Sequence, residues 1–258
     1  MDNYEAFKEK VLKLTQIDLS CYKERQMRRR IDSLIAKAGI KTYDEYVDSL
    51  KNNQEILDEF LGYLTINVSE FYRNPEQWEL MQTEVLPYLF KKFGKRLKIW
   101  SAACSTGDEP YTLVMVLSKF IPIDQIEIIA TDIDKQILEK AQLGMYDEKS
   151  LRGLPKEFKD KYFTKVGTRS YQVSEEIKKH VKFQQHNLLK DSYPTNLDMI
   201  VCRNVMIYFT EEAKQVMYKK FNDSLKKEGI LFVGSTEQII APAKYNFSTY
   251  QSFFYLKE

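Results

Sequence analysis

The chain has 258 residues, of which 43% are hydrophobic, and its 39 basic and 37 acidic residues leave a formal net charge of +2. This length suits one large domain or one medium domain with a small one, and the apolar fraction is sufficient for a sizeable core. The near-balance of charge gives no support for a general nucleic-acid-binding protein, which usually has a strongly basic domain.

Two further classes of protein are not expected from the sequence. The opening segment, MDNYEAFKEKVLKL, alternates charged and apolar side chains, so we expect no signal peptide. The longest strongly apolar stretch, residues 113–117, is far shorter than the ~20 residues that span a bilayer, so we expect no membrane insertion.

The cysteines, Cys21, Cys104 and Cys202, are widely separated and odd in number, which favours a reduced, cytoplasmic location. The two histidines have no partners at ligand spacing, so we predict no metal site.

Residues 1–73 are predicted to form a small all-helical domain. Apolar side chains recur at helical spacing, for example from Met27 to Ala38, and Gly39 then suits the end of that helix. Thr42, followed three residues later by Glu45, is typical of the capping box that opens a helix. No good strand is expected in this region.

A new pattern begins at Asn74-Pro75, where the residue before the proline disfavours helix. We expect a helix over 75–93 with a proline in its first turn, and we expect the internal Pro87 to kink or interrupt it.

From residue 97 onward, predicted strands alternate with predicted helices. This alternation indicates a mainly parallel sheet with helices on both faces. A small hairpin around Lys165-Val166-Gly167-Thr168 interrupts it, and the tail 247–256 alternates as one or two antiparallel edge strands do. The expected strands are 97–103, 126–131, 181–185, 197–202 and 230–234, and the expected helices are 109–120, 135–143 and 211–227.

The first two informative sites follow the first and second predicted strands. The small residues of Ala103-Cys104-Ser105-Thr106-Gly107 would let backbone N–H groups approach a ligand, although a simple tight turn is the alternative and the pattern is not GxGxxG. Asp132 ends the second strand, where an acidic residue commonly accepts hydrogen bonds from both ribose hydroxyls of a nucleoside. Asp134 is better suited to cap the next helix. Together the two sites favour an adenosine-containing ligand.

Three other segments have polar or basic character. After the fourth strand, residues 202–209 contain a polar pair and a tyrosine that could hold a reacting group. The alternative is a strand-to-helix connection whose aromatic residues pack in the core. At the domain junction, 65–73 offers polar side chains and one arginine, or else a plain linker. Arg25, Arg28 and Arg29 share the helix side away from Met27, as a solvated face or as a patch for an acidic partner.

These segments together resemble the chemotaxis receptor methyltransferases, the CheR family. The matching text covers about residues 60–237 in family order: TINVSEFYRNP, IWSAACSTGDEPYTL, ATDIDKQILEKAQLGMY, FQQHNLL, LDMIVCRNVMIYF and GILFVGSTE.

The resemblance implies an α/β fold: a Rossmann-like methyltransferase domain over 74–258, with a mostly parallel doubly wound sheet and a small antiparallel β insertion at about 162–183. It implies an all-helical domain over 1–73 that recognises receptors. The implied methyl donor is S-adenosylmethionine (SAM), the product is S-adenosylhomocysteine (SAH), and the acceptors are receptor glutamates, which become methyl esters.

The resemblance also implies the site residues. Arg73 and Tyr208 resemble the pair that the family places near the transferred methyl group. The basic residues Arg25, Arg28 and Arg29 lie in the region implicated in binding the receptors' methylation helices. Two departures are visible: Ser69 stands where threonine is common, and KVGTRSY lacks the glycine-rich loop of relatives that dock a receptor tether. The implied SAM-contacting residues are Asn67, Ser69, Arg73, Glu109, Asp132, Asn187, Leu188, Arg203 and Asn204.

Glutamate esterification fits the residues present, because a carboxylate with an ordinary pKa of ~4.3 is already ionised at neutral pH and needs no general base. A methyltransferase for nucleic acid or a small molecule is the nearest alternative. However, Arg203-Asn204-Val205-Met206 stands where amine methylases usually carry an Asn/Asp-Pro-Pro-Tyr motif. A SAM-binding protein without turnover is the second alternative. We expect a monomer that binds receptors, and neither nucleic acid nor membrane.

Overall fold

The computed structural model describes residues 3–65 and 68–258 and forms two compact units. The first unit comprises residues 1–67 with 205–217, and the second comprises 68–204 with 218–258. The segment 205–217 therefore groups with the N-terminal residues, although the sequence analysis places it in the second domain.

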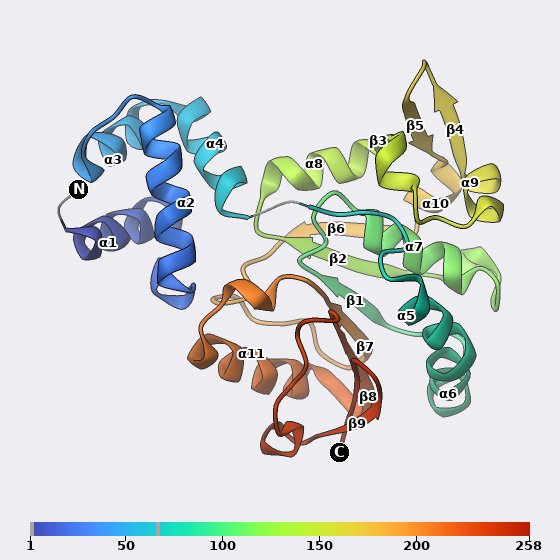
Figure 1. Cartoon of the computed structure of the whole chain (residues 1–258). Coiled ribbons are helices and arrows are strands. Elements are labelled where there is room, and N and C mark those ends of the chain that lie inside the picture. Colours follow the sequence, from blue (N-terminus) through green and yellow to red (C-terminus); the bar gives the residue numbers. More distant parts are fainter. Residues whose placement is uncertain (1–2, 66–67) are drawn as a thin grey trace. The chain divides into compact units, whose positions relative to one another are not determined.

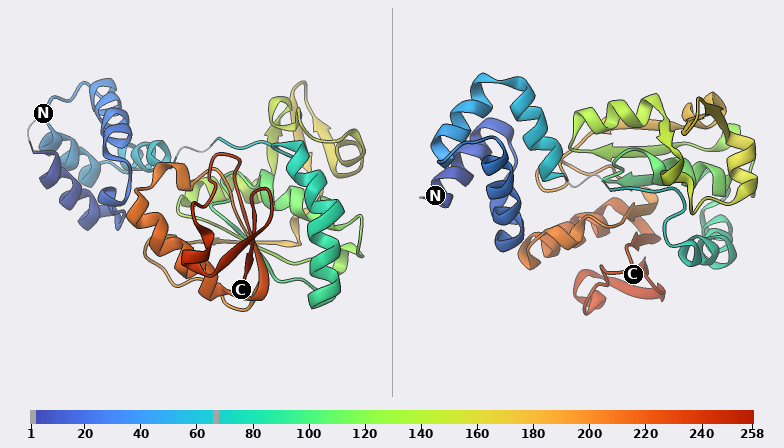
Figure 2. Two further views of the ribbon diagram at one scale, coloured as in Figure 1. Left: turned by 60° about the horizontal axis from the view of Figure 1, so that its bottom comes forward. Right: turned by 45° about the horizontal axis from the view of Figure 1, so that its top comes forward.

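The first unit is built mainly from four helices, drawn in blue in both views of Figure 2. They are α1 (Tyr4–Thr15), α2 (Glu24–Lys37), α3 (Tyr43–Asn52) and α4 (Gln54–Leu64), with a short 3-10 turn, η1 (Leu19–Cys21), before α2. Their apolar faces meet in a core that includes Phe7 and Tyr43, whose ring centroids lie 4.8 Å apart.

The predicted helix ends in this unit are confirmed. Gly39, with φ of 72°, follows the end of α2, and its N–H donates to the carbonyl of Ala36. Thr42 and Glu45 form the predicted capping box at the start of α3, in which each side chain accepts from the other residue's backbone N–H.

The segment 205–217 contributes η5 (Met206–Tyr208) and the first half of α11 (Glu211–Ser224) to the first unit. The Lys23 N–H donates to the carbonyl of Tyr208 at 2.9 Å, and the rings of Tyr22 and Phe209 lie 5.0 Å apart. The backbone of Tyr208 is therefore held beside the residues that precede α2.

The second unit contains a large sheet with the strand order β6-β2-β1-β7-β8-β10-β9 (Figure 1). Its first five strands are parallel, and β10 and β9 are antiparallel, so the predicted mainly parallel sheet and antiparallel tail are confirmed. The strands are β1 (Ile99–Ala102), β2 (Ile128–Asp132), β6 (Val181–Gln185), β7 (Leu197–Cys202), β8 (Leu225–Val233), β9 (Phe247–Gln251) and β10 (Phe254–Lys257). Because parallel strands end at the same edge, the residues after β1, β2, β6 and β7 lie along one side of the sheet.

The predicted interruption at Pro87 is confirmed as a change of helix type. The chain runs as α5 (Pro75–Leu80), a π-helical turn η2 (Met81–Val85) and α6 (Leu86–Phe93). A proline lacks an N–H and crowds the carbonyl four residues earlier, and the wider π turn before it accommodates both effects.

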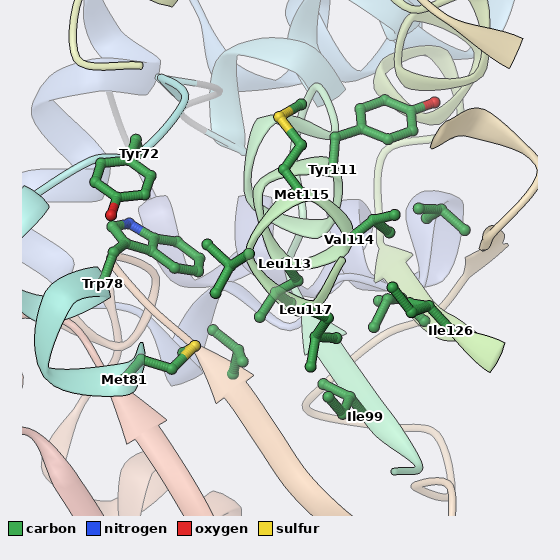
Figure 3. Close-up of a cluster of buried hydrophobic side chains, with 14 of the residues drawn as sticks. Tyr72, Trp78, Met81, Ile99, Tyr111, Leu113, Val114, Met115, Leu117 and Ile126 are labelled. Atoms are coloured by element: carbon green, nitrogen blue, oxygen red, sulfur yellow. The ribbon is translucent and has the colours of Figure 1, made fainter. Parts of the chain in front are cut away.

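The core of the second unit joins the sheet to the junction segment (Figure 3). Tyr72 stacks on Trp78, with ring centroids 5.8 Å apart and ring planes inclined by 22°. Leu113 and Leu117 of α7 (Asp108–Leu117) are buried in the same cluster as Ile99 of β1. The aromatic residues of the junction thus fix its backbone against the sheet domain.

A second, three-stranded antiparallel sheet lies beside α9 and α10, in yellow-green in Figure 1. The predicted hairpin is confirmed as β4 and β5, but the sequence analysis missed β3, whose three residues show no recognisable pattern until they pair with β5. The elements after β2 are α8 (Lys135–Leu143), β3 (Met145–Asp147), η4 (Glu148–Leu151), α9 (Lys156–Tyr162), β4 (Phe163–Val166), β5 (Ser170–Val173) and α10 (Glu175–Lys178). Two further 3-10 turns are η3 (Ile123–Gln125) and η6 (Pro242–Tyr245).

Within the described ranges, none of the helices has both the length and the apolar character needed to cross a bilayer.

Candidate functional site

The turn between β1 and α7 has an unusual backbone. Ala103 and Ser105 adopt left-handed φ values of 61° and 48°, and Gly107 has φ of 89°. A Cβ on Gly107 would lie 3.0 Å from the Cβ of Ala141, so a larger residue would not fit without a shift. Non-glycine residues in this region are energetically unfavourable and cluster at functional sites. The turn of small residues is therefore tightly constrained at the carboxyl edge of the sheet.

Asp132 closes this turn from the neighbouring strand. Its Oδ2 accepts the Ser105 N–H at 2.9 Å and its Oδ1 accepts the Asp134 N–H at 3.1 Å. Burial raises the pKa of Asp132 to about 6, against the lowering effect of these backbone hydrogen bonds. A carboxylate can accept about four hydrogen bonds, so capacity for a ligand hydroxyl remains. Asp134 caps α8 by accepting the Ile137 N–H, as predicted.

The chain after β6 lies directly beside Asp132. The His186 N–H donates to the carbonyl oxygen of Asp132 at 2.9 Å. The next residues form a tight turn in which the Asn187 side chain accepts the Leu189 N–H. The carbonyl of Leu188 accepts from the hydroxyl of Tyr193 and the Nζ of Lys220, so this turn is fixed from two sides.

The chain after β7 places a buried arginine at the same edge. The side chain of Arg203 is only 2% exposed. Its Nη2 donates to the carbonyl of Arg73 at 2.8 Å and to Oε1 of Gln77 at 2.7 Å, and Asn74 accepts a longer bond of 3.2 Å. Its Nη1 lies 3.6 Å from Oε2 of Glu109. Arg203 thus ties the junction segment to the sheet.

Glu109 is the acidic partner in this buried cluster. It accepts a hydrogen bond of 2.8 Å from the hydroxyl of Ser101 on β1. Burial raises the pKa of Glu109, and the nearby Arg203 opposes the rise. Glu109 and Arg203, two of the predicted donor-binding residues, therefore bond to protein partners, while the buried Nε of Arg203 has no hydrogen-bond partner among the described residues.

Arg73, in contrast, is half-buried, and no ion pair joins it to an acidic side chain in the part of the chain that the structure describes. Its Nη1 donates a long hydrogen bond of 3.5 Å to the carbonyl of Val68. Its own carbonyl accepts from Nε1 of Trp78 at 3.0 Å as well as from Arg203. The backbone of Arg73 is fixed while its guanidinium has capacity for an anion.

Two predicted residues precede Arg73. The hydroxyl of Ser69 forms a hydrogen bond with the carboxyl of Asp108, a fully buried group whose pKa is raised to about 6 by burial. Asn67 lies outside the described residues. Ser69 is thus held at the first residue of α7.

The structure brings most of the predicted residues together within the second unit, at the ends of β1, β2, β6 and β7. Tyr208 belongs to the first unit and Arg73 to the second, so their pairing stays a prediction, as do the individual contacts to a donor. The sequence analysis did not identify Ser101, Gln77 or Glu237. Gln77 lies outside the motif text, whereas Ser101 lies in IWSAACSTGDEPYTL and Glu237 in the GSTE text that follows β8.

Two cysteines flank this edge. Cys104 follows β1 and Cys202 ends β7, and both thiols are fully buried with pKa values raised well above the usual range by burial.

The geometry fits an adenosine-containing donor. Asp132 offers a buried acceptor for ribose hydroxyls, and the constrained small-residue turn leads into the N-terminus of α7 beside it. The described residues contain no group of three or more histidine, cysteine or acidic side chains placed to hold a metal.

Comparison with known proteins agrees with this geometry. The family model described as "CheR methyltransferase, SAM binding domain" matches residues 67–254, and "CheR methyltransferase, all-alpha domain" matches residues 2–65. A chemotaxis protein methyltransferase of Listeria monocytogenes is 42% identical over 241 residues, covering 93% of this chain and 92% of the relative.

Two other relatives with related names are more distant. A chemotaxis protein methyltransferase of Borreliella burgdorferi is 34% identical, covering 86% of this chain and 83% of its own length. Chemotaxis protein methyltransferase 1 of Pseudomonas aeruginosa is also 34% identical, covering 92% and 90%. The chain therefore belongs to the CheR family of SAM-dependent chemotaxis methyltransferases.

Proposed function

We propose that the protein transfers the methyl group of SAM to glutamate side chains of methyl-accepting chemotaxis receptors, in the cytoplasm, forming glutamate methyl esters. The observation that carries the proposal is the state of Arg73. It is a half-buried cation without an acidic partner among the described residues, and its backbone is held at the cofactor edge by Arg203. An anionic acceptor, or the charged end of the donor, would supply the missing partner.

The chemistry requires little proton transfer. The donor supplies a methyl group on a positively charged sulfur, and the acceptor oxygen bonds to that methyl as its bond to sulfur breaks. Asp132 would orient the donor through its ribose hydroxyls, and Arg73 would orient a carboxylate. Positioning of this kind can supply ~7–11 kcal/mol of a reaction barrier in favourable cases. Tyr208 would shape the path of transfer.

The receptor-binding part of the proposal rests on α2. Glu24, Arg25, Arg28, Arg29 and Asp32 line a hollow of about 600 Å³. The guanidinium of Arg28 lies 5.0 Å from the ring of Tyr4 and bonds to Tyr43, so it is partly committed to the unit's own packing. Arg25 and Arg29 are exposed and offer charge to an acidic helix surface.

The main experiment incubates the protein with tritium-labelled SAM and receptor-containing membranes. Label on glutamate is released as methanol by mild base, whereas an N-methyl group is retained, and peptide mapping then locates the esters. We expect base-labile label on receptor glutamates. Base-stable label, or donor binding without transfer, would refute the proposal.

Kinetics of two variants test the catalytic pair. We expect Arg73→Ala to lose most of its turnover, because the anion loses its counter-charge, and Tyr208→Phe to turn over more slowly. Near-normal turnover in both variants would remove Arg73 and Tyr208 from the mechanism.

A pair of charge reversals tests the α2 surface. We expect Arg25→Glu with Arg29→Glu to reduce receptor modification while SAH binding stays at the wild-type level. Lys95→Glu with Arg96→Glu, exposed and in the other unit, changes the net charge equally and serves as the control. Equal loss of receptor modification in both double variants would contradict a local role for α2.

A further inference from the structure

The loop after β8 carries a buried carboxylate that contacts the end of β7. Glu237 is 5% exposed, and its Oε2 accepts the Asn204 N–H at 2.6 Å and the Gly234 N–H at 2.9 Å. We propose that Glu237 is a positioning residue that holds the Arg203–Asn204 turn in the shape that binds the methyl donor. The inference rests on the proposed placement of Asn204 beside the donor.

The turn at Asn204 needs such a partner. Asn204 has a left-handed φ of 61°, a conformation that asparagine adopts more readily than most residues other than glycine. Its N–H leaves the β7 ladder and points to the carboxylate. A charged oxygen is a stronger acceptor than a neutral one, and a buried N–H without an acceptor is unfavourable. Glu237 therefore stabilises the particular conformation in which the Asn204 side chain is presented.

Gly234 makes room for this contact. A Cβ on Gly234 would collide with Oε2 of Glu237 and would lie 2.9 Å from the nitrogen of Asn204. Because the φ of Gly234 is not in the left-handed region, the requirement at this position is for space. The absence of a side chain on Gly234 lets one carboxylate oxygen lie between the ends of two strands.

Glu237 also acts on the buried arginine. Its negative charge, like that of Glu109, favours the charged form of Arg203, whose pKa burial lowers. Arg203 in turn donates to the carbonyl of Arg73. Glu237 therefore supports two predicted parts of the site: directly the backbone of Asn204, and through Arg203 the backbone of Arg73.

A matched control lies at the other end of the same strand. Asp198, near the start of β7, is 1% exposed and accepts the Lys98 N–H at 2.7 Å and the Nζ of Lys226 at 2.8 Å. It is also a buried carboxylate that joins β7 to a neighbouring segment, but at the edge away from the cofactor. Loss of Asp198 should lower stability without changing donor affinity.

The experiment measures SAH affinity by calorimetry and the KM and kcat for labelled SAM, for variants whose folded fraction is first determined by circular dichroism. We expect Glu237→Ala to weaken SAH binding by about tenfold or more, as expected for loss of a charge-assisted hydrogen bond. Glu237→Gln keeps an acceptor and should remain within about threefold of wild type, since a neutral acceptor retains part of the bond. Asp198→Ala should lower the unfolding midpoint and leave SAH affinity unchanged.

Glu237→Asp keeps the negative charge but has a side chain that is shorter by one methylene, so the carboxylate lies further from the Asn204 N–H. This variant tests the positioning role if Glu237→Ala does not fold. Weaker donor binding in Glu237→Asp, with recovery in Glu237→Gln, supports the positioning role. Wild-type donor affinity in Glu237→Asp or in folded Glu237→Ala overturns it, as does an equal loss of affinity in Asp198→Ala. Donor binding by the wild-type protein without receptor esters would refute the glutamate proposal alone, whereas no donor binding at all would refute both.

Discussion

The ends of β2 and β7 look alike in the sequence but differ in the structure. A polar residue stands at the end of each strand, at the edge where the donor is expected: Asp132 is the last residue of β2, and Arg203 directly follows β7. Among the described residues, Asp132 accepts hydrogen bonds from backbone N–H groups and keeps capacity for a ligand. Arg203 is bonded to Arg73, Gln77 and Glu109, all from the protein itself. The same kind of motif position can therefore carry a residue with spare hydrogen-bonding capacity or one that is already bonded to other parts of the protein.

The largest effect expected from this comparison is on stability. Arg203→Met removes a buried guanidinium and leaves Glu109 without its cation, which typically costs about 3–5 kcal/mol of unfolding free energy. Urea unfolding followed by circular dichroism measures this loss. Adding Glu109→Gln should restore part of it, because the unpaired charge is then removed. A loss below about 1 kcal/mol, as for an exposed ion pair, would show that Arg203 is not an anchor.

A smaller effect, on donor binding, is expected when Asp132 at the end of β2 is substituted. Asp132→Asn removes the charged acceptor for ribose hydroxyls, and hydrogen bonds to charged groups contribute about 1.5–3 kcal/mol, so SAH should bind about 10- to 100-fold more weakly. Its loss of stability should be smaller than that of Arg203→Met, because removing a buried charge offsets the lost backbone bond. Calorimetry and urea unfolding together test this. Unchanged SAH affinity would exclude Asp132 from the ribose site.

The pH dependence of binding sharpens the same contrast. The pKa of Asp132 is raised to about 6 in the free protein, and ribose hydroxyls favour its ionised form, so the complex binds fewer protons than the free protein below that value. SAH affinity should therefore fall as the pH drops through 6, by at most about tenfold per pH unit. Comparing pH 7.5 with pH 5.5 by calorimetry reveals the slope.

The control for this pH dependence is Asp132→Asn, because Asp108 also has a pKa of about 6. If Asp132 is responsible, the variant binds weakly with little dependence on pH. A slope that persists in the variant would assign the titration to another buried carboxyl, Asp108 or Glu109.

The smallest expected effect concerns the support of Glu109. Ser101→Ala removes a hydroxyl that donates to this buried carboxylate, and we expect a loss of about 1 kcal/mol of unfolding free energy. Ser224→Ala, which removes a buried hydroxyl bonded to the carbonyl of Lys220, is a comparison without a buried charge and should cost less. Equal losses in the two variants would show that Glu109 does not depend on Ser101.

The sequence predicts the strands and the donor edge because local patterns determine them. The apolar run of β7 and the capping residue Asp134 are recognisable within a few neighbours. The partners of Arg203 cannot be recognised from neighbouring residues, because Arg73 and Gln77 lie 130 and 126 residues away in the chain. Only the fold of the sheet domain brings them together. β3 was missed for the same reason, because three residues become a strand only by pairing with β5.

The buried thiols at the edge where the donor is expected provide a built-in measure of how often this edge opens. Cys104 and Cys202 are fully enclosed, so a thiol-reactive dye can reach them only when the ends of β1 and β7 separate from their surroundings. Cys21, partly exposed in the helical unit, would be modified first and gives an internal reference for the dye. A bound donor should slow the labelling of the two enclosed thiols. The labelling rate of these native cysteines would then report the fraction of the protein that has the cofactor bound.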